Sequence, residues 1–180
     1  MTLESCLQQI TDPRRSQGKR ISFVQLFSLI VICNLCGHLG GRAVARFAKN
    51  YQSSFTEQLC LKHKVPSHVT ISDFINRVNQ QEMIEAFNKW TSNYVPLKKG
   101  EAISGDGKAL GSTVTNTYSQ HQDFQAIVSL FCQRSGLVYA IEQYKNKKVS
   151  EANVVRFLVK KLKGMGLNIF LDALHCQKKP

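Results

Sequence analysis

The chain has 180 residues, 43% of them hydrophobic, which is enough to bury the core of one ordinary domain or of two small ones. Its 24 Lys and Arg residues outnumber 12 Asp and Glu, and the formal net charge of +12 favours a polyanionic partner, such as DNA phosphates or an anionic membrane surface. Six cysteines lack the dense spacing of a secreted disulfide scaffold, which favours free thiols in a reducing cytosol.

The segment before residue 23 predicts a short helix followed by a basic loop. Apolar residues at positions 3, 7 and 10 repeat at helical spacing, and the helix should end before Pro13 because the residue preceding proline avoids helical geometry. The loop TDPRRSQGKR follows, and its cations either contact DNA phosphates or lie solvated in a simple connection. These candidate DNA contacts are Arg14, Arg15, Lys19 and Arg20.

The longest apolar run, FVQLFSLIVICNLC over residues 23–36, predicts a buried helix and not a membrane anchor. Its apolar residues at 23, 26, 27, 30 and 33 follow the helical pattern, and glycines at 37, 40 and 41 end it. The run is interrupted by polar residues and is shorter than the roughly 20 apolar residues that a span needs. We therefore expect no membrane partner.

Three further helices are expected before residue 95. The first covers 42–51 and has an apolar face at positions 44, 47 and 48. The second is capped by Ser67 or Thr70. The third carries apolar residues at positions 83, 84, 87 and 90. Two of these helices could form a helix-turn-helix, or they could pack together without contacting DNA. In the first case the exposed face would hold Ser72, Asn76 and Arg77.

Cys33 and Cys36 have the spacing of half a zinc site. No second CxxC or HxxxH motif follows to complete four ligands. Free cysteine is among the most often buried residue types, so buried structural thiols are the favoured interpretation, and the same holds for Cys176.

The composition changes at residues 95–100, VPLKKG, where proline, lysine and glycine break the helical pattern. We place a domain boundary here, between a helical domain over 1–95, a candidate for DNA binding, and a second domain over 96–180. The second domain should begin with a strand at 102–106, followed by an antiparallel hairpin of 124–134 and 137–145 that Ser135-Gly136 closes. A helix at 151–163, capped by Ser150, should follow. The short apolar run at 167–171 suits a central parallel strand that is reached by a helical crossover.

Two aspartates stand at the ends of predicted strands. Asp106 lies between two glycines, where Asp-Gly alone would most often mark a turn, and Asp172 ends the last strand. The order strand, strand, strand, helix, strand is the opening of a ribonuclease H-like fold, and open α/β sheets place ligands at the carboxyl ends of their strands. We therefore predict an α+β or α/β chain, in which an all-helical domain precedes a partial ribonuclease H-like domain. Paired aspartates on a basic protein suggest metal-assisted chemistry on phosphodiesters.

The residues themselves also resemble a family. The segments AISGDGKALGS, KNKKVSEANVV and especially LDALHCQKK are similar to the DDE transposases of bacterial insertion sequences, in the subgroup that includes the H-repeat-associated proteins. The segments TDPRRSQGKR, LFSLIVICNLCG and VPSHVTISDFINRVN resemble the helical domain that precedes the catalytic core in that subgroup. The resemblance covers nearly the whole chain.

The resemblance implies DNA transposition, a form of DNA recombination, by metal-dependent strand cleavage and transfer. Three carboxylates of the family enzyme hold two divalent ions, one activating the attacking oxygen and the other stabilising the leaving oxygen. Asp106 matches the first acid and Asp172 the second, so both are predicted catalytic residues and metal ligands, for Mg²⁺ or Mn²⁺. The family's arginine after DGK is missing, because Leu110 is followed by Gly111. The further candidate phosphate contacts are Lys108, Lys178 and Lys179.

The family's third acid, a glutamate on a downstream helix, has no counterpart before the last residue, Pro180. Glu151 heads a predicted helix, where the helix dipole alone accounts for a carboxylate. We therefore expect an N-terminal fragment of a transposase that is inactive alone and whose last strand is an unpaired sheet edge. The alternative is a non-catalytic DNA-binding remnant or regulator of a full-length transposase, and a poorer third option is a peripheral membrane protein.

The expected partners follow from this resemblance. They are DNA at the ends of an insertion sequence and a second copy of the chain or a full-length transposase. The expected location is the bacterial cytoplasm, at the nucleoid when the protein is bound to DNA.

Overall fold

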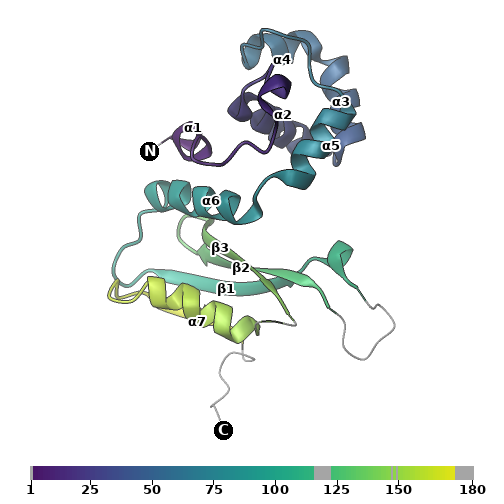
Figure 1. Ribbon diagram of the computed structural model, residues 1–180. Coiled ribbons are helices and arrows are strands. Elements are labelled where there is room, and N and C mark those ends of the chain that lie inside the picture. The colour runs from purple at the N-terminus through teal and green to yellow at the C-terminus, as the bar shows by residue number, and fades with distance from the viewer. Residues whose placement is uncertain (1, 116–122, 147, 149, 173–180) are drawn as a thin grey trace. The chain divides into compact units, whose positions relative to one another are not determined.

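The computed structural model describes residues 2–115, 123–146, 148 and 150–172 (Figure 1). Contacts divide the chain into two compact units, one over Thr2–Met83 and one that begins at Ile84. The division lies earlier in the chain than the change in composition at residues 95–100. The first unit is helical and the second holds a mixed sheet with helices, so the predicted α+β class is confirmed.

The first unit buries one apolar core. Its helices are α1 (Leu3–Leu7), α2 (Phe23–Leu35), α3 (Gly41–Asn50), α4 (Gln52–Gln58) and α5 (His68–Arg77). The predicted apolar faces of α2 and α3, together with the apolar side of α5, supply most of the core, and Leu26, Val44 and Ile71 are completely shielded from solvent. The four helices predicted within this unit are confirmed as α1, α2, α3 and α5, and α4 is an addition because its segment, QSSFTEQ, has a single large apolar residue, Phe55, and no visible periodicity.

Helix α2 is the predicted buried helix. Ser22 begins it with a capping box, in which the Ser22 hydroxyl accepts from the Gln25 backbone N–H and the Gln25 side chain accepts from the Ser22 N–H. Among the described residues, no helix is long and apolar enough to cross a membrane.

Helices α3 and α5 pack closely at one point, where Gly41 meets α5. A Cβ atom at Gly41 would lie 2.0 Å from the Ser72 Oγ and 3.0 Å from the His68 carbonyl oxygen. Glycine is required there because any side chain would push the two helices apart. Of the two predicted caps of α5, Ser67 is the correct one, since its hydroxyl accepts from the Thr70 N–H.

The second unit is a four-stranded sheet with α6 (Gln80–Tyr94), most of which belongs to it, and α7 (Glu151–Lys161). The strands are β1 (Ala102–Ala109), β2 (Gln125–Cys132), β3 (Leu137–Lys145) and β4 (Asn168–Leu171), in the spatial order β3-β2-β1-β4. The predicted hairpin is confirmed as the antiparallel pair β2–β3, and the crossover through α7 makes β4 parallel to β1. The prediction of a central position for β4 is wrong for the described sheet, because β4 lies at its edge beside β1. The other expectation, a last strand at the sheet edge, is confirmed for the described residues.

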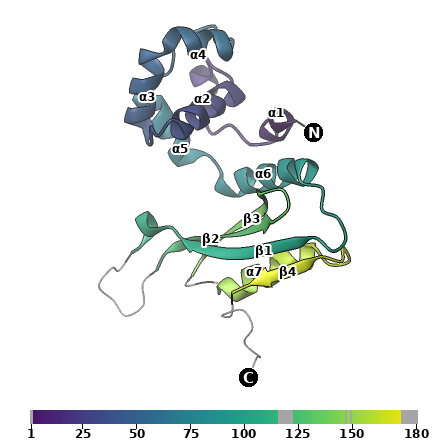
Figure 2. The same cartoon turned by 180° about the vertical axis from the view of Figure 1, so that it is seen from behind.

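Helix α7 lies across one face of the sheet (Figures 1 and 2). Its residues Val154, Val155 and Leu158 pack with the alternate residues of β1 and β2 that face them, among them Ile103 and Val128. Ser150 occupies the N-cap position as predicted, but its side chain makes no capping hydrogen bond.

Helix α6 covers the outer edge of β3 through side-chain amides and hydroxyls. Asn88 donates to the Ile141 carbonyl oxygen and accepts from the Ile141 N–H, both at 2.8 Å, and the Thr91 hydroxyl donates to the Tyr139 carbonyl oxygen at 2.6 Å. Asn88 thus satisfies the edge strand as a neighbouring strand would, and this edge cannot pair with another chain there.

We expect Asn88→Ala to lower the free energy of unfolding of the sheet unit by about 2 kcal/mol, since a half-buried N–H and C=O lose their partners. The measurement is urea unfolding, together with hydrogen exchange at the Ile141 amide, which should become faster. The matched control is Asn93→Ala on the same helix, because Asn93 is exposed and the hydrogen bond it makes among the described residues stays within α6, to the Lys89 carbonyl oxygen. Equal losses in the two variants would contradict a specific role for Asn88.

Candidate active site

Asp106 lies inside a strand and not in a turn. Strand β1 continues through Gly105, Asp106 and Gly107 to Ala109, and Asp106 pairs with Ser129 of β2. Alternation along the strand points Ile103 and Gly105 toward the buried side and exposes Asp106. The residues of the DGK motif therefore present the aspartate on the face of the sheet opposite α7.

The parallel pairing of β1 with β4 brings the second predicted aspartate to the same level. Strands β1 and β4 lie side by side (Figure 2). Gly105 pairs with Leu171, and Asp106 and Asp172 are the residues that follow this pair. Neighbouring strands lie about 5 Å apart, so two carboxylates at this level can contact one small ion. Asp172, like Asp106, is exposed.

The glycines on either side of Asp106 leave room for groups on the α7 face of the sheet. A Cβ at Gly105 would lie 2.7 Å from the Leu171 Cδ2, and one at Gly107 would lie 2.4 Å from the Glu151 Cδ. Gly105 therefore allows β4 to lie against β1 with Leu171 inward. This seating of Leu171 is what positions the next residue, Asp172.

Glu151 lies on the other side of the sheet from Asp106. Its carboxylate covers Gly107 and accepts a hydrogen bond from the Tyr144 hydroxyl at 3.2 Å. Burial, together with the charge and hydrogen bond of Glu151, raises the pKa of Tyr144 to about 12, so the phenol stays protonated at neutral pH. Glu151 is thus occupied in packing, and its carboxylate faces away from the two aspartates.

Two other acids of the second unit have local partners. Glu101 pairs with Arg134, and the Glu142 carboxylate lies 3.8 Å from the Lys161 Nζ. Asp123 is bridged to Thr115 through its backbone. In the described part of the chain, no three His, Cys, Asp or Glu side chains group closely enough to hold a metal ion. The site therefore offers two acids, Asp106 and Asp172.

Two exposed carboxylates on neighbouring strands fit Mg²⁺. This ion prefers oxygen ligands, keeps several waters, and is commonly bound through one or two carboxylates together with substrate phosphates. Lys108 follows on the same face of β1 and is exposed, so its ammonium can reach a phosphate bound beside the aspartates.

In the basic loop after α1, two cations pair with Asp12 and two are exposed to solvent. The Arg14 side chain is only 6% exposed, and its Nη2 lies 2.9 Å from the Asp12 Oδ2 in an ion pair. Its guanidinium carbon lies 5.8 Å from the centre of the Phe74 ring. Lys19 lies 3.7 Å from the same carboxylate, whereas Arg15 and Arg20 are exposed. Arg14 therefore has a structural role, and Lys178 and Lys179 lie outside the described residues.

The Cys33 and Cys36 pair is split between the core and the surface. Cys33 is completely buried beside the Val44 carbonyl oxygen, and Cys36 is exposed. Burial, and to a lesser extent Cys36, raises the pKa of the Cys33 thiol to about 11, so it is not a thiolate ligand at neutral pH. Cys176 lies outside the described residues.

Residues 4–91 match the model of the family described as DDE_Tnp_1-associated. This part of the chain is therefore similar to a family associated with DDE transposases, which indicates a transposase-related role. The match spans α1 to α5 and most of α6, and it ends before the strands that carry the two aspartates. No curated protein and no solved structure matches the chain.

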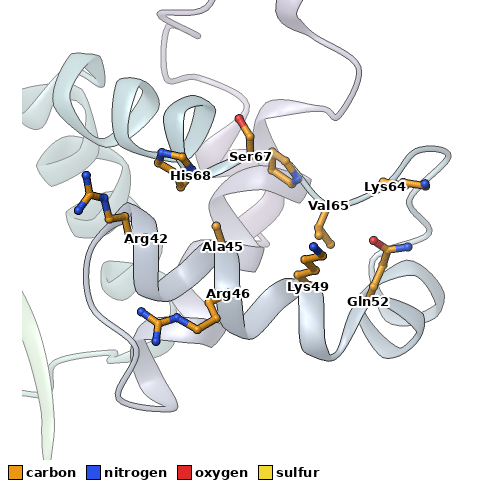
Figure 3. Close-up of a pocket in the computed structure, with 10 residues that line it drawn as sticks. Arg42, Ala45, Arg46, Lys49, Gln52, Lys64, Val65, Ser67 and His68 are labelled. Atoms are coloured by element: carbon orange, nitrogen blue, oxygen red, sulfur yellow. The ribbon is translucent and has the colours of Figure 1, made fainter.

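A basic groove in the part of the chain that is similar to this family was missed in the sequence. Arg42, Arg46 and Lys49 stand along α3 (Figure 3). Across from them lie Lys64, on the segment that leads into α5, and His68, the first residue of α5. The spacing of the three α3 cations, four and then three residues apart, is the signal that could have revealed this side of the groove.

Proposed function

We propose that this chain serves DNA transposition, with Asp106 and Asp172 as divalent-metal ligands of a site that acts on the DNA phosphodiester backbone. The observation that carries the proposal is the parallel register, in which Gly105 pairs with Leu171 directly before the two aspartates. The similarity of residues 4–91 to the DDE_Tnp_1-associated family supports the choice of reaction.

Each residue of the site would have a distinct task. Asp106 and Asp172 would hold the metal through carboxylate oxygens, and Lys108 would bind the neighbouring phosphate. Bound divalent ions supply activation of an attacking oxygen and stabilisation of a leaving oxygen in an in-line displacement. Gly105 would keep β1 and β4 close enough for the aspartates to act together, and Gly107 leaves room for the Glu151 carboxylate on the opposite face.

The finer assignment rests on the motifs of the sheet unit. We propose that the chain belongs to a bacterial insertion sequence of the H-repeat-associated subgroup and has a ribonuclease H-like catalytic fold, because LDALHCQKK and the order β1-β2-β3-α7-β4 both fit. Its partners would be DNA ends and a second transposase chain, in the bacterial cytoplasm.

The test is nicking of supercoiled plasmid by the whole chain in Mg²⁺ or Mn²⁺, combined with titration of Mn²⁺ binding by electron paramagnetic resonance. Asp106→Asn and Asp172→Asn should each weaken Mn²⁺ binding, since each removes one of two charged ligands, and each should abolish any nicking that the unchanged chain shows. Glu151→Gln is the matched control, because Glu151 lies against Gly107 on the opposite face.

The results separate the alternatives. Nicking or Mn²⁺ binding that survives both aspartate substitutions would remove this pair from the mechanism. If Glu151→Gln lost as much nicking or Mn²⁺ binding as Asp106→Asn, the two aspartates on the opposite face would not account for the site.

A second candidate function is a non-catalytic DNA-binding regulator of a transposase. It is favoured by the presence of only two acids at the site, without a third ligand among the described residues. In that case the chain binds DNA, shows no nicking in either metal, and inhibits nicking by an active transposase that recognises the same DNA.

A further inference from the structure

The basic groove is an open depression of the helical unit. It has a volume of about 560 Å³ and two walls (Figure 3). One wall is formed by α3 and the first residue of α4, and the other by residues 64–68. Its cations are Arg42, Arg46, Lys49 and Lys64, and its lining residues include no carboxylate. A neutralising acid is therefore missing from the groove wall.

The fold fixes the backbone positions of these four cations, but their charged groups form no ion pair with a described residue. Val44 and Ala48, which alternate with them on α3, are completely buried in the core, so the opposite side of α3 must face solvent. All four cations are exposed, and none forms an ion pair with a described residue. Their charges are thus available to a ligand, in contrast to the charge of Arg14.

We infer that this groove binds the phosphate backbone of double-stranded DNA. From Arg42 to Lys49, α3 rises about 10 Å, a length over which one DNA strand presents two or three phosphates. Lys64 extends the charge across the groove, and exposed His68 and Ser67 add polar groups where α5 begins. A row of separated cations suits a backbone of regularly spaced charges better than a single phosphate group.

The lining also favours duplex DNA over two other polyanionic ligands. It contains no Phe, Tyr or Trp on which unpaired bases could stack, so the usual platform for single strands is missing. Its apolar members are Ala45, Val65 and Pro66, which are too small to anchor a protein in an anionic membrane. Contacts to phosphates position a protein on DNA without reading its sequence, and we assign the groove this task.

The inference rests on the proposed function in the choice of DNA, but its site is separate from the two aspartates. The test is fluorescence anisotropy of the whole chain with a labelled 20-base-pair duplex, over a range of KCl concentrations. The variant Arg42→Gln/Arg46→Gln/Lys49→Gln should bind at least about tenfold more weakly, and the slope of log K against log salt should fall by about three.

The matched control removes the same charge elsewhere. Arg156→Gln/Lys160→Gln/Lys163→Gln changes three exposed cations in or directly after α7 and should leave both affinity and slope close to those of the unchanged chain. Far-ultraviolet circular dichroism should show that both triple variants are folded, because all six residues are exposed and glutamine keeps the helix.

Three outcomes would overturn the inference: unchanged binding in the α3 variant, an equal loss in the α7 variant, or tighter binding to the single strand or to phosphatidylserine vesicles than to the duplex. Failure of the groove can be told from failure of the aspartate site. Asp106→Asn should retain salt-dependent duplex binding, and the α3 variant should retain Mn²⁺ binding.

Discussion

Replacing Asp12 with alanine should lower the free energy of unfolding of the helical unit by about 3 kcal/mol. The Asp12 carboxylate accepts hydrogen bonds from Arg14 through its backbone N–H at 3.0 Å, its Nε at 3.0 Å and its Nη2 at 2.9 Å. The Arg14 side chain is 6% exposed and lies over Phe74. Without Asp12, its guanidinium would remain buried with no carboxylate, which costs much more than the loss of a surface ion pair.

The double variant Asp12→Ala/Arg14→Met tests this explanation. Methionine removes the buried charge and still packs on Phe74, so the double variant should regain part of the lost stability. Hydrogen exchange within residues 2–83, followed by mass spectrometry during urea titration, separates this unit from the sheet. If the double variant is less stable than Asp12→Ala alone, the cost does not come from an unpaired charge.

The same pair predicts a pH dependence. Burial acts to raise the pKa of Asp12, but the hydrogen bonds and charge of Arg14, with the charge of Lys19, outweigh it, so the pKa is lowered. A lowered pKa in the folded state adds stability that is complete above the unfolded value near 4 and is lost as the pH falls through the folded value. The stability of the unchanged chain should therefore fall more steeply below pH 4 than that of Asp12→Ala, which can be measured by urea unfolding between pH 2 and pH 7.

The pattern of apolar residues predicted most of the elements for a physical reason. Burial of one face dominates the stability of a helix or strand, so α2, α3, α5 and α7 could be located from spacing alone. Short polar α4 could not, because Phe55 is its one buried residue. The burial of Arg14 was also hidden, since it depends on Phe74, a residue of a distant helix.

The candidate site was predictable in part. A helical crossover between two strands requires parallel pairing, so Asp106 and Asp172 could be expected at the same sheet edge. The exact register could not, because it depends on how Leu171 fits above Gly105. The basic groove was hidden for a similar reason, since Lys64 joins the cations of α3 only after the chain has turned back toward them.

Gly105→Val should both destabilise the sheet unit by about 3 kcal/mol and abolish Mn²⁺ binding at the two aspartates. A Cβ at this buried position would lie 2.7 Å from the Leu171 Cδ2 and 3.3 Å from the Leu130 Cδ2. The two further methyl groups of valine enlarge this overlap, and overpacking of a well-filled core costs about 1–3 kcal/mol. Leu171 is on the edge strand, so β4 is the element that can move away.

Movement of β4 would carry Asp172 with it. Among the described residues, four pairs join β4 to β1, and the last of them is Gly105 with Leu171, directly before the aspartates. A shift of this pair therefore changes the distance between the two carboxylates even where the rest of the sheet remains folded. Mn²⁺ titration by electron paramagnetic resonance and urea unfolding measure the two effects separately.

Two glycine substitutions control for the change of residue type. Gly111→Ala has nothing within 4 Å of the added Cβ and should leave stability and Mn²⁺ binding nearly unchanged. Gly107→Ala meets only the end of the flexible Glu151 side chain, so Gly107→Ala should cost less than Gly105→Val, and Glu151→Ala in the same chain should relieve it. If Gly105→Val keeps full Mn²⁺ binding while the sheet is destabilised, Leu171 does not position Asp172, and the two aspartates do not act as one site.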